Sequence, residues 1–228
     1  MKIEGFQKLT LQDFPNNMAC IIFTKGCNFE CPFCHNSSLV INKNEDNLID
    51  ESKIFEYLEK RRGILDGVVI SGGEPLVQKD IKEFIKKVRW LKYKIKLDTN
   101  GFNYELLKEL IDEKLVDYVA MDIKNSFDKY NLTIGKNLKI DNVIKSIELL
   151  KHSNIDFEFR TTIVKEFHDI DDIRSILKVV DGNKYFVQNF EDSGSVIKDG
   201  LHSFTIEELK SMNDILSKEF TNFKFRNL

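Results

Sequence analysis

Short apolar runs alternate along the chain with longer segments in which apolar residues recur at helical spacing. The apolar runs predict strands at residues 18–24, 67–71, 93–99, 116–123, 155–164 and 184–190. The amphipathic segments predict helices near residues 50–62, 78–91, 103–114, 140–152, 169–180 and 205–219. Such alternation is typical of right-handed βαβ crossovers and a parallel sheet. The pattern therefore predicts an α/β fold, built either as a barrel or as an open doubly wound sheet.

The alternation continues without a Pro/Gly/Ser-rich linker or a low-complexity tract, which predicts a single domain over residues 1–228. Residues 1–17 form a lead-in to the first core strand, and EGFQKLTLQDFP within them suggests a small hairpin. The first ten residues carry charge where a signal peptide would be apolar, and no stretch approaches the roughly eighteen apolar residues of a membrane span. We therefore expect a soluble, cytoplasmic protein without a membrane partner.

The charge balance is slightly acidic, with a net charge of −3. Because nucleic-acid binding usually needs a basic domain or face, we expect no nucleic-acid partner. The one basic stretch, residues 82–96, carries apolar residues at helical spacing. We interpret its lysines as the solvent-facing side of a helix that covers the sheet.

Unusual residues gather where the predicted strands end. A cysteine cluster follows the first strand, and SGGEP, LDTNG and AMDIK stand at the ends of the next three. Arg160 lies within the fifth strand and Gln188 near the end of the sixth. In parallel α/β folds, active sites are built at the carboxyl ends of the strands. We therefore expect these residues, although distant in sequence, to converge on one rim.

The cysteine cluster is one ligand short of a structural metal site. Cys27, Cys31 and Cys34 are spaced C-x3-C-x2-C and are followed at once by His35. A zinc knuckle would need His35 as fourth ligand, but adjacent residues rarely bring both side chains onto one tetrahedral ion. Cys20 lies inside an apolar strand and is interpreted as a buried small hydrophobe. Three thiolates can instead hold three irons of a [4Fe–4S] cluster and leave the fourth iron open, which we favour over structural zinc.

The glycine turn after the second strand has two interpretations. Gly72 and Gly73 allow the backbone to approach a ligand, and Glu74 or the bare carbonyls could receive an ammonium group. A tight strand-to-loop turn ending at Pro75 would explain the same residues.

Carboxylates stand at the ends of the third and fourth strands. Asp98, Thr99 and Asp122 could bind a small cation through hard oxygen ligands. Alternatively, the carboxylates take a ligand's ammonium group while Lys124 takes its carboxylate. A salt-bridge network at the rim, with a purely structural role, is the third possibility.

These motifs together resemble the radical S-adenosylmethionine (SAM) superfamily. C-x3-C-x2-C with an aromatic residue before the third cysteine, followed by Gly-Gly-Glu-Pro after the next strand, carries the resemblance. The blocks GFQKLTLQDFP, CPFCHN, KLDTNG, VDYVAMDIK and FEFRTT are similar to those of the activating proteins of glycyl radical enzymes. The resemblance implies a partial (β/α)6 TIM-like barrel in which Cys27, Cys31 and Cys34 hold a [4Fe–4S] cluster. Reductive cleavage of SAM there would produce methionine and a 5′-deoxyadenosyl radical.

The resemblance also implies cofactor contacts at particular residues. The Phe33 backbone would contact adenine, and Gly72, Gly73 and Glu74 would hold the methionyl ammonium. Lys124 would reach the SAM carboxylate, and Arg160 would lie near the ribose and carboxylate. Matching positions for a monovalent cation and the SAM amino group are Asp98, Thr99 and Asp122. Because VQNF replaces the family's Pro-Tyr-His after the sixth strand, Gln188 or Asn189 would substitute for that histidine.

The activating proteins act on another protein, so the resemblance implies a glycyl radical enzyme as partner, foremost anaerobic ribonucleoside-triphosphate reductase. Reduced flavodoxin or ferredoxin would be the electron donor. One alternative is an activase of another glycyl radical enzyme of the pyruvate formate-lyase type. Another is a radical SAM enzyme that acts on a small molecule, and a third is a non-catalytic module stabilised by zinc.

Overall fold

All strands in the described part of the chain belong to one curved sheet. The computed structural model describes residues 1–41, 46–192 and 194–226. The strands follow one another across the sheet in chain order: β1 (Ile3–Thr10), β2 (Ala19–Thr24), β3 (Gly67–Gly72), β4 (Lys94–Thr99), β5 (Tyr118–Asp122), β6 (Asp156–Ile163), β7 (Tyr185–Asn189) and β8 (Phe223–Arg226). β1 pairs antiparallel with β2, and every later neighbour pairs in parallel. The sheet does not close, because β1 and β8 form its two edges.

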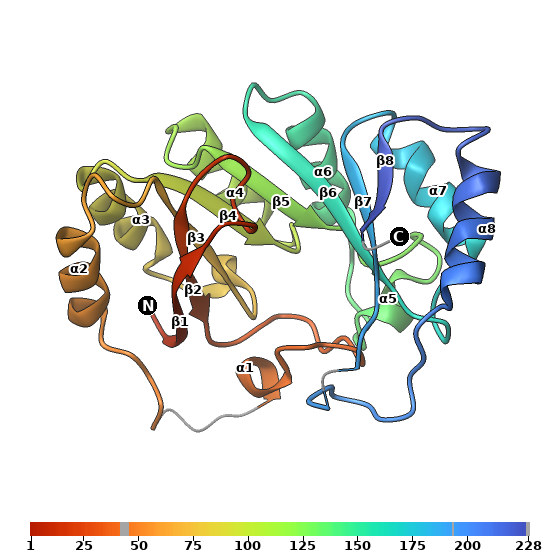
Figure 1. Ribbon diagram of the computed structural model, residues 1–228, viewed down its shortest axis with the longest axis horizontal. Coiled ribbons are helices and arrows are strands. Elements are labelled where there is room, and N and C mark those ends of the chain that lie inside the picture. Colours follow the sequence, from red (N-terminus) through yellow and green to blue (C-terminus); the bar gives the residue numbers. More distant parts are fainter. Residues whose placement is uncertain (42–45, 193, 227–228) are drawn as a thin grey trace.

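Helices connect the parallel strands, and the longer ones cover the convex face of the sheet (Figure 1). Their bounds are α1 (Ser37–Ile41), α2 (Glu51–Lys60), α3 (Ile81–Trp90), α4 (Tyr104–Asp112), α5 (Tyr130–Thr133), α6 (Asp141–Lys151), α7 (Ile170–Val180) and α8 (Ile206–Leu216), with a 3-10 turn η1 at Pro75–Val77. In Figure 1 the sheet forms an arc with α2 near one end and α8 near the other. The predicted partial (β/α)6 barrel is confirmed, with β2 to β7 as its six core strands.

Local chemistry explains why the longer helices begin where they do. Asp50 accepts a hydrogen bond from the Ser52 N–H at the start of α2, and Asn103 accepts one from Leu106 N–H at α4. α7 and α8 each open with a capping box, in which the cap and the third helical residue satisfy each other's backbone N–H groups. These caps supply partners for N–H groups that a helix terminus would otherwise leave free.

Two apolar clusters divide the interior. The larger one fills the space between the helices and the outer face of the sheet, where Phe84 and Ile85 of α3 lie in one cluster with Val68 and Leu97. The smaller one lines the inner face and includes Phe14, Ile21, Val69, Tyr118 and Ala120. Toward the carboxyl ends of the strands the inner face becomes polar. The barrel interior is therefore apolar at one end and can host a polar site at the other.

Parts of the fold differ from the sequence-based expectation. The lead-in contains β1, joined to β2 by residues 11–18, and the described C-terminal part adds the short strand β8. β8 consists of only four residues, FKFR, and alternation over so short a stretch does not predict a strand clearly. The basic stretch also divides: its helix ends at Trp90, and Lys96 lies on β4 with only 2% of its surface exposed.

Within the described ranges, every helix is too short or too polar to pass through a lipid bilayer.

Candidate active site

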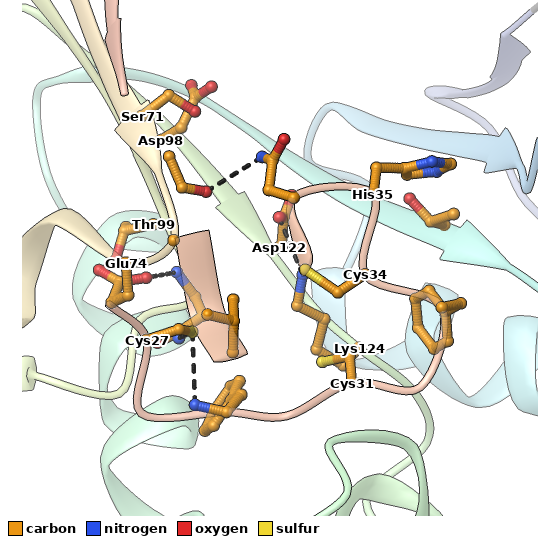
Figure 2. A pocket seen from close by; sticks show the side chains of 18 of the residues that line it. Cys27, Cys31, Cys34, His35, Ser71, Glu74, Asp98, Thr99, Asp122 and Lys124 are labelled. Atoms are coloured by element: carbon orange, nitrogen blue, oxygen red, sulfur yellow. Dashed lines mark hydrogen bonds and ion pairs between the residues drawn. The ribbon is translucent and has the colours of Figure 1, made fainter. Parts of the chain in front are cut away.

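A cavity of about 280 Å³ opens at the carboxyl ends of the strands. Its walls come from the loop after β2, the turn after β3 and the ends of β4 to β7. Most residues that the sequence singled out for cluster, SAM or cation binding line this cavity: Cys27, Cys31, Phe33, Cys34, Gly72, Gly73, Glu74, Asp98, Thr99, Asp122, Lys124, Arg160 and Gln188. Asn189, the alternative to Gln188, does not line it and instead exchanges hydrogen bonds with the Phe204 backbone. Figure 2 shows Cys31 and Cys34 beside Lys124, with Cys27 toward Glu74. The expected convergence on one rim is therefore present, while the role of each residue stays a proposal.

The cysteine loop is held by backbone hydrogen bonds to distant segments. Gly26 N–H donates to Leu39 O at 2.7 Å, Glu30 N–H donates to Ile134 O at 2.9 Å, and Lys198 N–H donates to Pro32 O at 2.9 Å. Within the loop, Phe29 N–H donates to Cys27 Sγ at 3.3 Å. The thiols are thus positioned by the surrounding fold.

The three thiols are free and lie in a low-dielectric setting. Burial raises the pKa of Cys27 to about 12 and that of Cys31 to about 11. A coordinated metal ion lowers a thiol pKa enough to deprotonate it. Soft thiolates of this kind suit iron–sulfur clusters. The donor set therefore fits an iron–sulfur cluster.

The geometry does not gather these ligands around one point. Among residues 1–41, 46–192 and 194–226, no three or more His, Cys, Asp or Glu side chains are arranged to hold a single ion. A cubane cluster instead binds one thiolate at each of several irons, so its ligands are spaced more widely.

The His35 ring packs against Phe190, with ring centroids 5.5 Å apart, and Figure 2 shows it directed away from the three thiols. Cys20 is fully buried in β2, as expected of a core residue.

The glycine turn after β3 touches the start of the cysteine loop. Gly73 N–H donates to Thr24 O at 2.9 Å, and Glu74 N–H donates to Gly26 O at 2.8 Å. A Cβ on Gly73 would lie 2.1 Å from Gly26 O, and one on Gly72 would lie 2.2 Å from Thr24 N. Gly72 also has a φ of +121°, which disfavours any residue with a side chain. Both glycines are therefore required by the turn itself, whether or not they also bind a ligand.

Glu74 is buried and engaged by its own chain. Its Oε1 accepts hydrogen bonds from Thr99 Oγ1 at 2.7 Å and from Leu76 N–H at 3.0 Å, while Oε2 accepts from Asn100 N–H at 2.7 Å. Burial outweighs these three donors and raises the pKa of Glu74 to about 7. The side chain therefore joins the β3 turn to the end of β4.

Oppositely charged side chains alternate along the ends of β4, β5 and β6. We call this set the charge ladder: Lys96, Asp98, Arg160, Asp122 and Lys124. Lys96 pairs with Asp98 Oδ1, and Arg160 Nη1 lies 3.6 Å from Asp98 Oδ2. Arg160 Nε lies 2.8 Å from Asp122 Oδ1, and Lys124 Nζ lies 3.0 Å from Asp122 Oδ2.

Asp122 and Lys124 are kept charged by their neighbours in the ladder. Burial alone would raise the pKa of Asp122, but the positive charges of Arg160 and Lys124 hold it well below its usual range. Burial alone would lower the pKa of Lys124, yet Asp122 keeps it above its ordinary value. The wall thus presents fixed charges suited to a zwitterionic ligand.

Some lining residues were not assigned from the sequence. Asn100 Nδ2 donates to Asn28 Oδ1 at 2.9 Å and lies 3.9 Å from Cys27 Sγ. Asn28 Oδ1 lies 3.9 Å from Cys27 Sγ, while Asn28 Nδ2 is buried and has no hydrogen-bond partner within the described ranges. Ser71 and Thr162 also line the cavity. The only sequence signal for Asn100 was its place in LDTNG.

Comparison with known proteins agrees with this geometry. The family model of the radical SAM superfamily matches residues 21–180. A protein of Methanocaldococcus jannaschii, provisionally named a glycyl-radical enzyme activating enzyme, is 34% identical over 99% of this chain and 96% of its own length. A second protein of that organism with the same provisional name is 32% identical over 69% of this chain and 60% of its own length.

A solved structure shows the same fold in a longer protein. Streptococcus suis SuiB bound to S-adenosylmethionine superposes with a TM-score of 0.69 at 17% identity, over 89% of this chain and 48% of SuiB. The cysteine spacing, the pocket and these matches agree, and we conclude that the chain belongs to the radical SAM superfamily, whose enzymes use SAM and an iron–sulfur cluster.

Proposed function

We propose that the protein is an activase that installs a glycyl radical on a partner enzyme, with anaerobic ribonucleoside-triphosphate reductase as the first candidate partner. The names of the two M. jannaschii relatives support the activase class, and the first of them matches nearly end to end. The observation that carries the proposal is the convergence of three free thiols and four members of the charge ladder (Asp98, Asp122, Lys124 and Arg160) on one cavity at the mouth of an unclosed barrel.

In this proposal Cys27, Cys31 and Cys34 are the protein ligands of a [4Fe–4S] cluster, and one iron remains for SAM. When bound and reduced, the cluster supplies the electron that cleaves SAM to methionine and a 5′-deoxyadenosyl radical. Asn100 places an amide donor 3.9 Å from Cys27 Sγ. Hydrogen bonds to cluster sulfurs help to set the reduction potential.

Charged side chains that line the same cavity orient SAM. Lys124 and Arg160 are the cationic groups that face the cavity and would hold the SAM carboxylate. Because the Glu74 oxygens already accept three hydrogen bonds, we assign the methionyl ammonium chiefly to the backbone around Gly72 and Gly73. Phe33 and Gln188 line the remaining walls and would contact the adenosyl part.

The open side of the barrel suits a substrate that is part of another protein. The sheet ends at β1 and β8 without pairing them, so a partner's loop could reach the inner face from that side. Reduced flavodoxin or ferredoxin is the proposed donor of the electron.

The test is anaerobic reconstitution with iron and sulfide, followed by reduction in the presence of SAM and a purified anaerobic reductase. We expect 5′-deoxyadenosine and a glycyl radical signal in the partner by electron paramagnetic resonance. Cys31→Ala should abolish both, whereas Cys20→Ala, which changes a core cysteine, should retain them. SAM cleavage without a radical on any glycyl radical enzyme would favour a small-molecule substrate, and a colourless protein containing zinc would refute the proposal.

A further inference from the structure

Lys96 is a buried ammonium group on the inner face of the barrel. Its side chain is 2% exposed, and its Nζ pairs with Asp98 Oδ1 and lies 5.9 Å from the centroid of the Tyr118 ring. Lys96 and Asp98 are two residues apart on β4, so their side chains share one face of the sheet. A charged lysine is seldom buried unless it is paired, so the position indicates a defined role for the pair.

The oxygens that a monovalent cation would need here are already engaged. Both oxygens of Asp98 have cationic partners in Lys96 and Arg160, and both oxygens of Asp122 have them in Arg160 and Lys124. Thr99 Oγ1 donates to Glu74 Oε1 at 2.7 Å and accepts from Gly101 N–H at 3.1 Å.

The local charge also opposes a cation. The ladder holds three cations and two carboxylates, so its own net charge is +1. An added monovalent cation would compete with fixed ammonium and guanidinium groups for the same oxygens. The residues present therefore do not fit a monovalent cation at this place.

We propose that Lys96 supplies, from within the chain, the positive charge that a monovalent cation would otherwise supply, so that SAM binding needs no such ion. This inference rests on the proposed SAM site. Lys96 does not line the cavity. It is a positioning residue that acts through Asp98, whose second oxygen lies 3.6 Å from the guanidinium of Arg160.

The experiment measures SAM affinity of the anaerobically reconstituted protein by equilibrium dialysis. The buffers contain potassium chloride, sodium chloride or N-methylglucamine chloride at one ionic strength. We expect wild-type affinity to agree within about twofold among the three salts, since no step of binding uses the ion.

Lys96→Met keeps most of the side-chain volume but frees Asp98 Oδ1. We expect it to lose about tenfold or more in SAM affinity in N-methylglucamine chloride and to recover part of that loss in potassium or sodium chloride. Lys96→Arg keeps the charge and should remain indifferent to the salt. Lys94→Met is the matched control, because Lys94 is an exposed lysine on the same face of the same strand and should behave as the wild type.

Loss of wild-type SAM affinity by about tenfold when potassium and sodium are both omitted would refute the role of Lys96 while leaving the SAM site intact. Lys96→Met with wild-type affinity in every salt would refute it as well. If the wild type bound SAM in none of the salts, both this inference and the proposed function would fail. The wild-type comparison needs no variant, so the test holds even if Lys96→Met does not fold.

Discussion

Gly73 occupies a point where two backbone segments nearly touch. Its own N–H bonds to Thr24 O, and the Gly26 carbonyl lies where its Cβ would be. The clash would be with backbone, which cannot move aside as a flexible side chain can. At the scale of single residues, the turn after β3 therefore sets how closely the cavity wall approaches the cysteine loop.

Gly73→Ala should lower the free energy of unfolding by about 2 kcal/mol or more, because overpacking against backbone forces the loop to shift. It should also reduce iron content after reconstitution, since Gly26 stands next to Cys27. Urea unfolding and iron analysis measure the two effects. Gly63→Ala is the control, because nothing lies within 4 Å of its Cβ and only its φ of +75° adds strain, at about 1 kcal/mol. Equal losses in the two variants would contradict the steric explanation.

At the scale of elements, His168 joins the ends of β5 and β6. Its Nε2 lies 2.8 Å from Lys124 O, and its Nδ1 accepts from Val164 N–H at 3.1 Å. This pattern requires the neutral ring with its proton on Nε2. Burial lowers the pKa of His168 below its ordinary 6.5, while Asp172 acts in the opposite direction and Lys129 in the same direction. Protonation at Nδ1 would leave Nε2–H donating to Lys124 O but would remove the hydrogen bond that the neutral ring accepts from Val164 N–H.

Acidification should weaken this connection. Just below pH 6.5 the unfolded chain binds a proton at this position that the folded chain resists, so stability falls as the pH falls through that window. His168→Gln should cost about 1–2 kcal/mol at pH 7.5 through lost buried hydrogen bonds, yet show a smaller further decline toward pH 5.5. Thermal melts at both pH values test this. His152→Gln, at a ring with 76% exposure, should retain the wild-type decline, and an unchanged decline in His168→Gln would count against the role.

At the scale of the whole molecule, the site depends on every parallel strand that ends at the rim. The loop after β2, the turn after β3 and the ends of β4 to β7 each contribute to one cavity. A ligand that bridges the cysteine loop and the charge ladder therefore connects segments separated by more than a hundred residues of sequence. Such a ligand should stabilise the folded chain as a unit.

SAM at about one hundred times its Kd should raise the Tm of the reconstituted protein by about 5–10 °C, which corresponds to roughly 2.7 kcal/mol in a chain of this size. Anaerobic removal of iron with a chelator should abolish most of that shift, because the amino and carboxylate groups of SAM would lose the open iron. Differential scanning fluorimetry measures both states, with adenosine as a ligand control that lacks those groups. A shift of equal size without iron would argue against binding through the cluster.

Much of this molecule could be predicted from the order of its residues. Alternating periodicities identify β2 to β7 and the six longer helices, because burial on one face leaves a regular apolar pattern. Parallel strands bring their carboxyl ends to one edge, so Cys27, Gly73, Asp98 and Asp122 could be placed on a common rim without coordinates. The cysteine spacing, together with its place at the rim, predicted a cluster with an open iron.

Only the tertiary structure decided which side chains pair. Periodicity predicts the face on which a residue lies but not its partner across the sheet, so Lys96 could be taken for a solvated lysine although it is buried against Asp98. For the same reason the hydrogen bonds that engage Glu74 were not predictable. The sequence by itself determined where the core strands lie and which reactive side chains stand at their carboxyl ends, because both follow from the local pattern of residues. The tertiary structure decided which carboxylates are already paired with cations of neighbouring strands, because the distances between those side chains are defined only once the sheet is assembled.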